Sequence, residues 1–226
     1  ALSRLFRNNH DGTFTDVASH VGLDHAWLPM GANFGDVDND GWLDIYLATG
    51  DPRFEMLVPN VLLRSEAGQR FEDITFSAGL GHLQKGHGVA FADFDDDGDQ
   101  DLYNQLGGFY PDDKFRNALF LNPGTPGHGF ISLELTGTKS NRDAIGARIT
   151  LVLELPGGGT REIHRAAGSV SSFGGSPLRQ EIGLGNATGI RSLTVRWPAG
   201  TVETFSNVPR NTAQRIKEGS GQLEQI

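Results

Sequence analysis

Apolar positions in the first half of the chain occur in short runs that glycine, asparagine, aspartate and proline interrupt. The runs at residues 14–17, 42–47, 88–93 and 101–103 are rich in β-branched and aromatic residues, which favour strands over helices. Their leucine and aromatic side chains are expected to pack within a sheet. The pattern predicts about four short strands in every 57 residues, which is the content of one propeller blade.

The pattern changes after residue 128. Residues 130–135 and 147–155 alternate apolar and polar positions, as half-buried strands do, and a glycine-rich turn at 156–159 leads into a strand-like segment at 160–164. Residues 192–197 and 201–205 form a predicted hairpin around Pro198-Ala199-Gly200. The second half therefore predicts a compact antiparallel β-sandwich or barrel, and the whole chain is predicted to be all-β.

Residues 93–101 have the spacing of a calcium loop. Their pattern, D-x-D-x-D-G-x-x-D, places carboxylates at the first, third, fifth and ninth positions and a glycine at the sixth, where the backbone must turn sharply. Calcium needs such a set, because it takes about 6–8 oxygen ligands at roughly 2.3–2.6 Å. The loop leads into strand-forming residues and lacks the Glu that closes an EF-hand, so it is not an EF-hand. The predicted ligands are the carboxylates of Asp93, Asp95, Asp97 and Asp101 and the carbonyl oxygen of Asp99.

A second loop of the same form occupies residues 36–44, 57 residues earlier. One such loop alone has a simpler interpretation as an acidic surface turn, because Asp-Gly pairs are common turn formers. Two copies in register favour calcium. The sequence therefore predicts two Ca²⁺ sites, and the ligands of the second are Asp36, Asp38, Asp40, Asp44 and, through its carbonyl oxygen, Trp42.

The 57-residue shift aligns more than the loops. Leu5-Phe6-Arg7 falls on Leu62-Leu63-Arg64, and a third copy begins at residue 117 without a third acidic loop. We therefore predict calcium-binding repeats at about 3–59 and 60–116, a partial third strand at 117–125, and a separate β domain at 126–226.

Charge is divided unevenly between these parts. Residues 1–128 hold 20 acidic and 8 basic residues, a net charge of −12, whereas residues 129–226 have a net charge of +3. Eight of the 20 acids are the predicted loop ligands, so two divalent ions would offset part of this charge. Nucleic acid is not an expected partner of such a surface. The chain has no cysteine, which excludes disulfides and thiolate zinc sites, and no apolar run approaches the ~18 residues of a membrane span.

Residues 4–17 and 86–99 resemble FG-GAP/VCBS repeats, the calcium-binding blades of integrin α-subunit heads and of many secreted bacterial proteins. The resemblance covers roughly residues 3–125 and implies a β-propeller, usually of seven blades. Two repeats are too few to close such a ring. The chain is therefore expected either to be the C-terminal piece of a longer protein or to pack its blades differently.

The second half is similar to the ASPIC/UnbV domain. The similarity rests on residues 137–148, a predicted turn at 183–185, residues 195–200 and residues 207–211, and it covers about residues 130–218. That domain follows FG-GAP-type repeats in the cartilage acidic protein and in many bacterial secreted proteins. It implies an architecture, and it supplies no catalytic residue for this chain.

Few residues outside the loops are candidates for a function. Asn141, Arg142 and Asp143 could bind an anion or contact the repeats, although a hydrogen-bonded turn is the favoured interpretation. His87 lies between two glycines just before the second loop and could reach a functional surface, although packing is favoured, since its counterpart in the first repeat is Met30. No catalytic residue is predicted, because the serine-rich run at 168–174 contains no G-x-S-x-G.

Together these patterns predict a calcium-binding protein whose ions stiffen its repeats. We expect it to be extracellular or periplasmic, because calcium is abundant outside the cytosol. We expect a binding or adhesion scaffold for an extracellular protein or glycan. The alternative is a calcium-dependent extracellular enzyme, a glycoside- or ester-active hydrolase or a polysaccharide lyase. The scaffold is favoured because the conspicuous acids are committed to the loops. The oligomeric state is not predicted.

Overall fold

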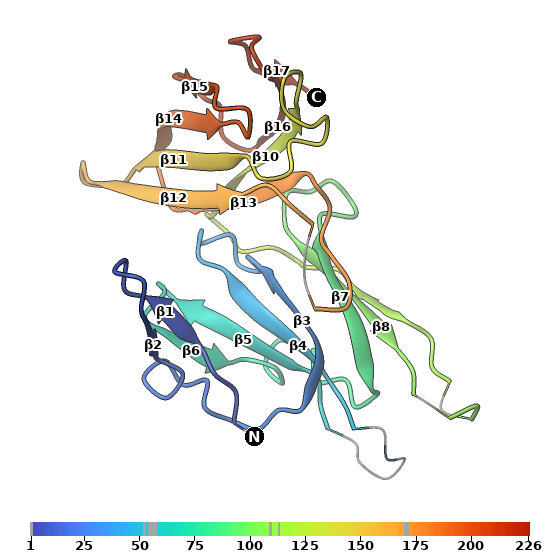
Figure 1. The fold of residues 1–226 in the computed structure, drawn as a ribbon. Helices are drawn as coiled ribbons and strands as arrows, with labels where there is room; N and C mark the ends of the chain where they lie inside the picture. The colour runs from blue at the N-terminus through green and yellow to red at the C-terminus, as the bar shows by residue number, and fades with distance from the viewer. Residues whose placement is uncertain (1, 52, 54–57, 109, 113, 170–171) are drawn as a thin grey trace.

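The computed structural model describes residues 2–51, 53, 58–108, 110–112, 114–169 and 172–226. These residues form seventeen strands and no helix, which confirms the all-β prediction. Accordingly, the described segments include no helix of the length and apolar character that a membrane span requires. Figure 1 shows the C-terminal strands as a separate unit above two sheets that lie side by side.

The first half forms a two-stranded hairpin and two blade-like antiparallel sheets, which confirms the prediction of propeller-type blades. The hairpin joins β1 (Phe6–Asn8) and β2 (Phe14–Asp16). The first sheet has the order β3 (Pro29–Gly35), β4 (Asp44–Thr49), β5 (Val61–Glu66) and β6 (Arg70–Asp73). The second has the order β7 (Gly86–Ala92), β8 (Asp101–Leu106) and β9 (Ala118–Phe120).

The two blades pack closely along β3 and β7. A Cβ atom at Gly31 would lie 1.7 Å from the carbonyl oxygen of His87, and one at Gly35 would lie 2.4 Å from the ring of Phe91. Only glycine permits this approach, because real Cβ contacts are much longer. The core between the sheets includes the fully buried side chains of Tyr46 and Phe91. This contact fixes the two blades relative to each other.

The second half forms a sandwich of two four-stranded sheets, which we call the C-terminal domain (β10–β17). One sheet has the order β13 (Gln180–Gly185), β10 (Gly129–Thr136), β16 (Thr212–Lys217) and β17 (Glu224–Gln225). The other has the order β12 (Thr160–Ala166), β11 (Arg148–Glu154), β14 (Gly189–Arg196) and β15 (Val202–Phe205). Its core is buried between the sheets and includes Leu133, Leu151, Leu193 and Trp197.

Two details of the C-terminal domain differ from the prediction. Strand β10 pairs with β16 in parallel, so the sandwich is not wholly antiparallel; the pairing joins segments about 80 residues apart, which local periodicity does not reveal. Residues 183–185, predicted as a turn, belong to strand β13. Gly183 is needed there for a close contact: a Cβ atom on it would lie 2.4 Å from the Asp36 carboxylate.

The C-terminal domain rests on both blades. Its segment 172–176 runs beside β3 and β7: Ser172 exchanges backbone hydrogen bonds with Ala32 at 3.2 Å, and the Phe173 carbonyl accepts the N–H of Val89 at 3.0 Å. Strands β12 and β13 contact the loop that joins β3 to β4, and the segment at Arg179 contacts the loop that joins β7 to β8. Both predicted calcium loops therefore lie at the junction of the blades and the C-terminal domain.

Candidate metal centre

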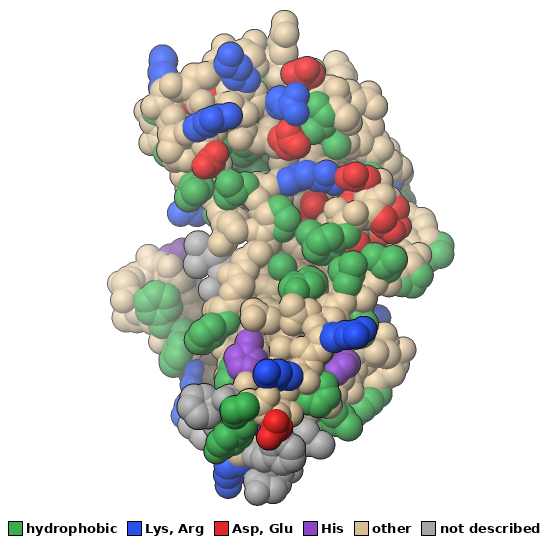
Figure 2. Space-filling model, turned by 90° about the vertical axis from the view of Figure 1, so that its right-hand side faces the viewer, with side chains coloured by type: hydrophobic (Ala, Val, Ile, Leu, Met, Phe, Trp, Pro, Cys, Tyr) green, Lys and Arg blue, Asp and Glu red, His purple; other side chains and the backbone are tan. Residues whose placement is uncertain are grey.

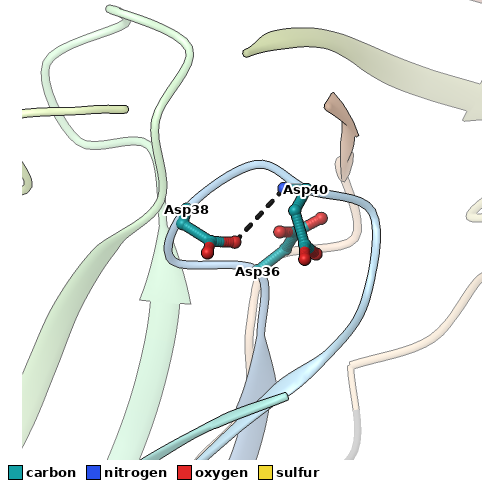
Figure 3. A group of neighbouring side chains, drawn as sticks. All are labelled: Asp36, Asp38 and Asp40. Atoms are coloured by element: carbon teal, nitrogen blue, oxygen red, sulfur yellow. Dashed lines mark hydrogen bonds between the residues drawn. The ribbon is translucent and has the colours of Figure 1, made fainter. Parts of the chain in front are cut away.

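The first acidic loop directs three carboxylates toward one point. Oxygen atoms of Asp36, Asp38 and Asp40 lie within 4.8 Å of one another, and Figure 3 shows the three side chains turned into the loop. The Asp38 carboxylate also accepts the backbone N–H of Asp40 at 3.3 Å. Three carboxylates this close repel one another, so the arrangement favours a bound cation.

Asp36 is the most constrained of the three. Its side chain is 1% exposed, and its Oδ2 accepts the backbone N–H groups of Gly41 at 3.0 Å and Gly183 at 3.2 Å. Its Oδ1 is buried without a hydrogen-bond partner among the described residues. Burial raises the pKa of Asp36 to about 7, although the nearby positive charge of Arg165 acts to lower it. A buried oxygen of this kind is costly unless something pairs with it.

The sharp turns of both loops depend on residues with positive φ. Gly41 and Gly98, at the sixth positions, have φ values of 90° and 94°. At the fourth positions, Asn39 and Asp96 have φ values of 54° and 58°, a conformation that Asn and Asp tolerate better than most residues. The two loops thus share the same backbone path, one repeat apart.

The ninth aspartate of the first loop, Asp44, accepts hydrogen bonds from the backbone on both sides of it. The carboxylate of Asp44 accepts the backbone N–H of Val37 at 2.8 Å and that of Ser65 at 2.7 Å. Asp44 does not belong to the group of carboxylates that converge in the first loop, although burial raises its pKa to about 8. It connects the loop to strand β5, and its role as an ion ligand stays a prediction.

The second loop brings together a slightly different set. Oxygen atoms of Asp93, Asp95 and Asp101 lie within 4.8 Å of one another. Asp97, a predicted ligand, is exposed and is absent from this group; its carboxylate accepts the backbone N–H of Asp99 at 2.9 Å. Asp93 accepts the N–H of Gly98 at 3.0 Å, as Asp36 accepts that of Gly41.

The two loops differ in exposure. In the first, Asp36 is buried and Asp38 and Asp40 are half-buried, whereas Asp95 and Asp97 of the second are exposed. Figure 2 shows acidic side chains gathered beside a basic one at the level where the C-terminal domain meets the blades. The second loop is therefore the more accessible to solvent.

Trp42, predicted to offer its carbonyl oxygen, has a half-buried side chain. Its backbone N–H donates to the Asp40 carboxylate at 2.7 Å. The guanidinium carbon of Arg161 lies 5.7 Å from the centre of the Trp42 ring, within the range of a cation–π interaction. The residue thus joins the first loop to strand β12.

Arginines of the C-terminal domain hold the backbone of the first loop. Arg161 donates to the carbonyl oxygen of Asp40 at 2.6 Å, and Arg165 donates to that of Gly41 at 3.1 Å. Arg165 also lies 3.8 Å from the Asp36 carboxylate. Because residues four apart on a strand face the same side, β12 presents both arginines to the loop.

Arg179 has the corresponding position at the second loop. It pairs with Asp93 at 3.1 Å and with Asp96 at 3.0 Å. Beside it, the carboxylate of Glu181 accepts the backbone N–H of Asp93 at 3.2 Å, and burial raises the pKa of Glu181. The two Arg179 ion pairs compensate part of the negative charge of the loop.

The other candidate residues lie apart from the loops. His87 is half-buried in β7, six residues before Asp93. Because each strand residue advances about 3.3 Å, His87 lies near the opposite end of β7 from the second loop. Asn141 accepts the N–H of Ile145 at 2.8 Å within a turn, and Arg142 and Asp143 are exposed beside it. The described hydrogen bonds of this turn are within the C-terminal domain. A ligand role for these residues stays a prediction.

Several residues of this site were not predicted from the sequence. Arg161, Arg165 and Arg179 were missed because more than 80 residues separate them from the loops that they contact. Asn39 and Gln100 occupy loop positions without a predicted ligand role, yet both form hydrogen bonds between the loops. In the sequence, only the excess of basic residues in the second half indicated that this half could contact the acidic loops.

The donor atoms decide which ion fits. The converging groups of both loops are carboxylate oxygens, with no cysteine in the chain. Hard cations such as Ca²⁺ prefer oxygen ligands, whereas softer metals favour thiolate and imidazole. The unpartnered Oδ1 of Asp36 fits such an ion. Both clusters can hold a hard divalent metal ion.

Comparison with known proteins gives two family matches. Residues 3–47 match the family model described as FG-GAP-like repeat, and residues 137–223 match the one described as ASPIC and UnbV. The first match includes the whole first acidic loop. A search of the curated proteins found no match. Two separate segments of the chain are thus similar to two families in the predicted order.

Proposed function

The chain combines an FG-GAP-like repeat with an ASPIC/UnbV domain, and from this architecture we propose that it is a secreted, calcium-binding β-repeat protein that serves as a binding scaffold. Two calcium ions occupy the acidic loops and fix the junction between the blades and the C-terminal domain. The surfaces kept rigid in this way bind an extracellular protein or a glycan.

One observation carries the calcium proposal. The Asp36 carboxylate converges with those of Asp38 and Asp40, and its buried Oδ1 atom has no hydrogen-bond partner in the described part of the chain. Nearby Arg165 donates to a carbonyl oxygen and lies 3.8 Å from the other carboxylate oxygen, Oδ2. A divalent ion would supply the missing positive charge and favour the ionised carboxylate.

The ion's effect follows from the repulsion within each loop. An ion that binds the folded loop and not the unfolded chain contributes its binding free energy to folding. This stabilisation is about 2.7 kcal/mol when the free ion is at one hundred times its dissociation constant. Extracellular calcium reaches the millimolar range in which modest-affinity loops are filled, which is why we place the protein outside the cytosol.

Thermal unfolding tests the calcium proposal. We expect calcium to raise the melting temperature above that in chelator, and the Asp36→Asn variant to lose most of the increase. Asp24→Asn, which changes an exposed acid outside the loops, is the matched control and should keep it. Identical melting curves of the unaltered protein with calcium and after exhaustive chelation would contradict the proposal. Screening for bound glycans and proteins, with and without calcium, then tests the scaffold role.

A further inference from the structure

The two acidic loops contact each other directly through Asn39. Its side-chain nitrogen donates to the carbonyl oxygen of Gly98 at 3.0 Å and to the carboxylate of Asp99 at 2.6 Å. Asn39 is the fourth residue of the first loop, and both acceptors belong to the second. The conformation of the second loop therefore determines where the hydrogen-bond acceptors of Asn39 lie.

A second connection runs through Gln100. Its Oε1 accepts the backbone N–H of Asp36 at 2.7 Å, and its Nε2 donates to Glu181 at 3.2 Å. The same Glu181 carboxylate accepts the backbone N–H of Asp93. The first residues of both loops are thus held by one continuous hydrogen-bonded network, and such networks strengthen their members cooperatively.

A third connection comes from Asn122, which follows β9. Its side-chain nitrogen donates to the carbonyl oxygen of Val37 in the first loop at 2.7 Å and to that of Gln100 in the second at 3.0 Å. One amide group therefore spans both loops. Disorder in either loop would break at least one of these bonds.

The internal repeat shows that the Asn39 contact is specific to the first loop. The residue one repeat later, Asp96, has the same left-handed backbone, but its carboxylate faces Arg179 of the C-terminal domain at 3.0 Å. The first loop thus reaches the second loop, and the second loop reaches the C-terminal domain. Position four is the connecting residue in each case.

We propose that the two ion sites are energetically coupled, so that occupancy of the second loop raises the affinity of the first. The inference rests on the proposed calcium function. An ion in the second loop fixes Gly98 and Asp99, which accept the hydrogen bonds of Asn39. The first loop then loses less conformational entropy when it binds its own ion, because its contacts are already ordered. By linkage the effect is reciprocal, and couplings of this kind are typically about 5- to 150-fold in affinity.

Trp42 allows the first site to be observed separately. It is the seventh residue of the first loop, whereas the second loop has Asp99 there. Terbium replaces calcium in oxygen sites and emits when a nearby tryptophan is excited, so titration of the full chain with Tb³⁺ reports the first loop. Loss of the emission in Trp42→Phe assigns the signal to Trp42, because Trp27 and Trp197 remain, and its loss in Asp36→Asn assigns it to the first loop.

The test disables the second loop with Asp95→Asn, an exposed ligand position. Coupling predicts that this change weakens Tb³⁺ binding at the first loop by at least about 5-fold. An unchanged affinity of the first loop would overturn the coupling while leaving the calcium proposal intact. Absence of sensitised emission in the unaltered protein would overturn both.

Asn39→Gly then identifies the connecting residue. Glycine keeps the positive φ and removes only the side chain, so Asp95→Asn should weaken the first site less in the Asn39→Gly background. Asp96→Gly is the matched control, since it makes the same change at the equivalent position and should leave the coupling unaltered. An undiminished effect of Asp95→Asn in Asn39→Gly would overturn the assignment to Asn39.

Discussion

The carboxylate of Asp44 accepts the backbone N–H of Ser65 at 2.7 Å, and this bond joins the end of the first acidic loop to the third strand of its sheet. One repeat later, Asp101 accepts the N–H of Asn122 at 2.8 Å. The same residue type at the same loop position makes the same contact 57 residues apart. In the first loop this contact holds the ninth aspartate independently of any ion.

We therefore expect Asp44→Asn to destabilise the protein even in chelator. The amide nitrogen of Asn would face a backbone N–H, and leaving a buried group unpaired costs about 1–3 kcal/mol. Urea unfolding followed by tryptophan fluorescence measures the change. Asp38→Asn, which alters a half-buried residue of the converging set, is the control and should lose ion affinity with little loss of ion-free stability. Equal ion-free stabilities of the two variants would contradict this division of roles.

Gly183→Ala tests the contact between strand β13 and the first loop. A Cβ atom there would lie 2.4 Å from both the Asp36 carboxylate and the backbone of Asn39, so the C-terminal domain must shift away. Overpacking of this kind costs about 1–3 kcal/mol. Gly168→Ala is the matched control, because a Cβ atom at Gly168 has no neighbour within 4 Å among the residues that the structure describes. Similar urea midpoints for the two variants would show that the first loop moves to accommodate the added methyl group without loss of stability.

The pKa of Asp36 predicts how ion-free stability depends on pH. Burial raises this pKa to about 7 in the folded protein, whereas the unfolded value is about 3.9. Between these values the folded state binds more protons than the unfolded state, so this residue's contribution to stability falls as pH rises. The slope is at most about 1.4 kcal/mol per pH unit. The difference in unfolding free energy between the unaltered protein and Asp36→Asn, measured in chelator, isolates the effect, and a difference that is constant with pH would contradict it.

Calcium affinity should show the opposite pH dependence. The ion needs the ionised carboxylate, so it displaces the Asp36 proton when it binds below the pKa of about 7. We expect the affinity of the first loop to rise with pH up to that value and then to level off. Tb³⁺ titrations observed through Trp42 at several pH values check this, and a pH-independent affinity would place the bound ion away from Asp36.

How much of this site the sequence could predict depends on the distance between the groups. The D-x-D-x-D-G-x-x-D spacing predicted that Asp36, Asp38 and Asp40 would converge, because nine consecutive residues determine that geometry. It could not separate Asp40 from its counterpart Asp97, since both belong to the same pattern and only tertiary contacts distinguish them. Arg165 and Glu181 lie on strands whose periodicity predicts which residues are buried, but not which residues of the acidic loops they contact.

The same limit applies to the fold. Alternating apolar positions predicted the strands and the sandwich, because each strand has its own period. The parallel pairing of β10 with β16 depends on which strands are neighbours, and a single sequence does not contain that information in its local pattern. The proposed boundary near residue 125 stays a prediction.

Glu218 provides a pH test that is independent of any metal ion. Its carboxylate accepts the backbone N–H groups of Thr138, Lys139 and Ser140, each at 2.8 Å. Burial opposes ionisation, but these three bonds and the Ser140 hydroxyl hold the pKa of Glu218 at about 2. The carboxylate thereby fixes the turn that also contains Asn141.

This depressed pKa gives a contribution to stability that is fully present above the unfolded value of about 4.3 and is lost as pH falls toward about 2. We expect Glu218→Gln to be less stable than the unaltered protein at neutral pH, and the gap to narrow progressively as the pH falls below the unfolded value. Glu224→Gln, an exposed change on β17, is the control and should show no such gap. Urea midpoints across this range measure it. A gap that stays constant down to the lowest pH would mean that the side chain stabilises the turn by its shape and not by its charge.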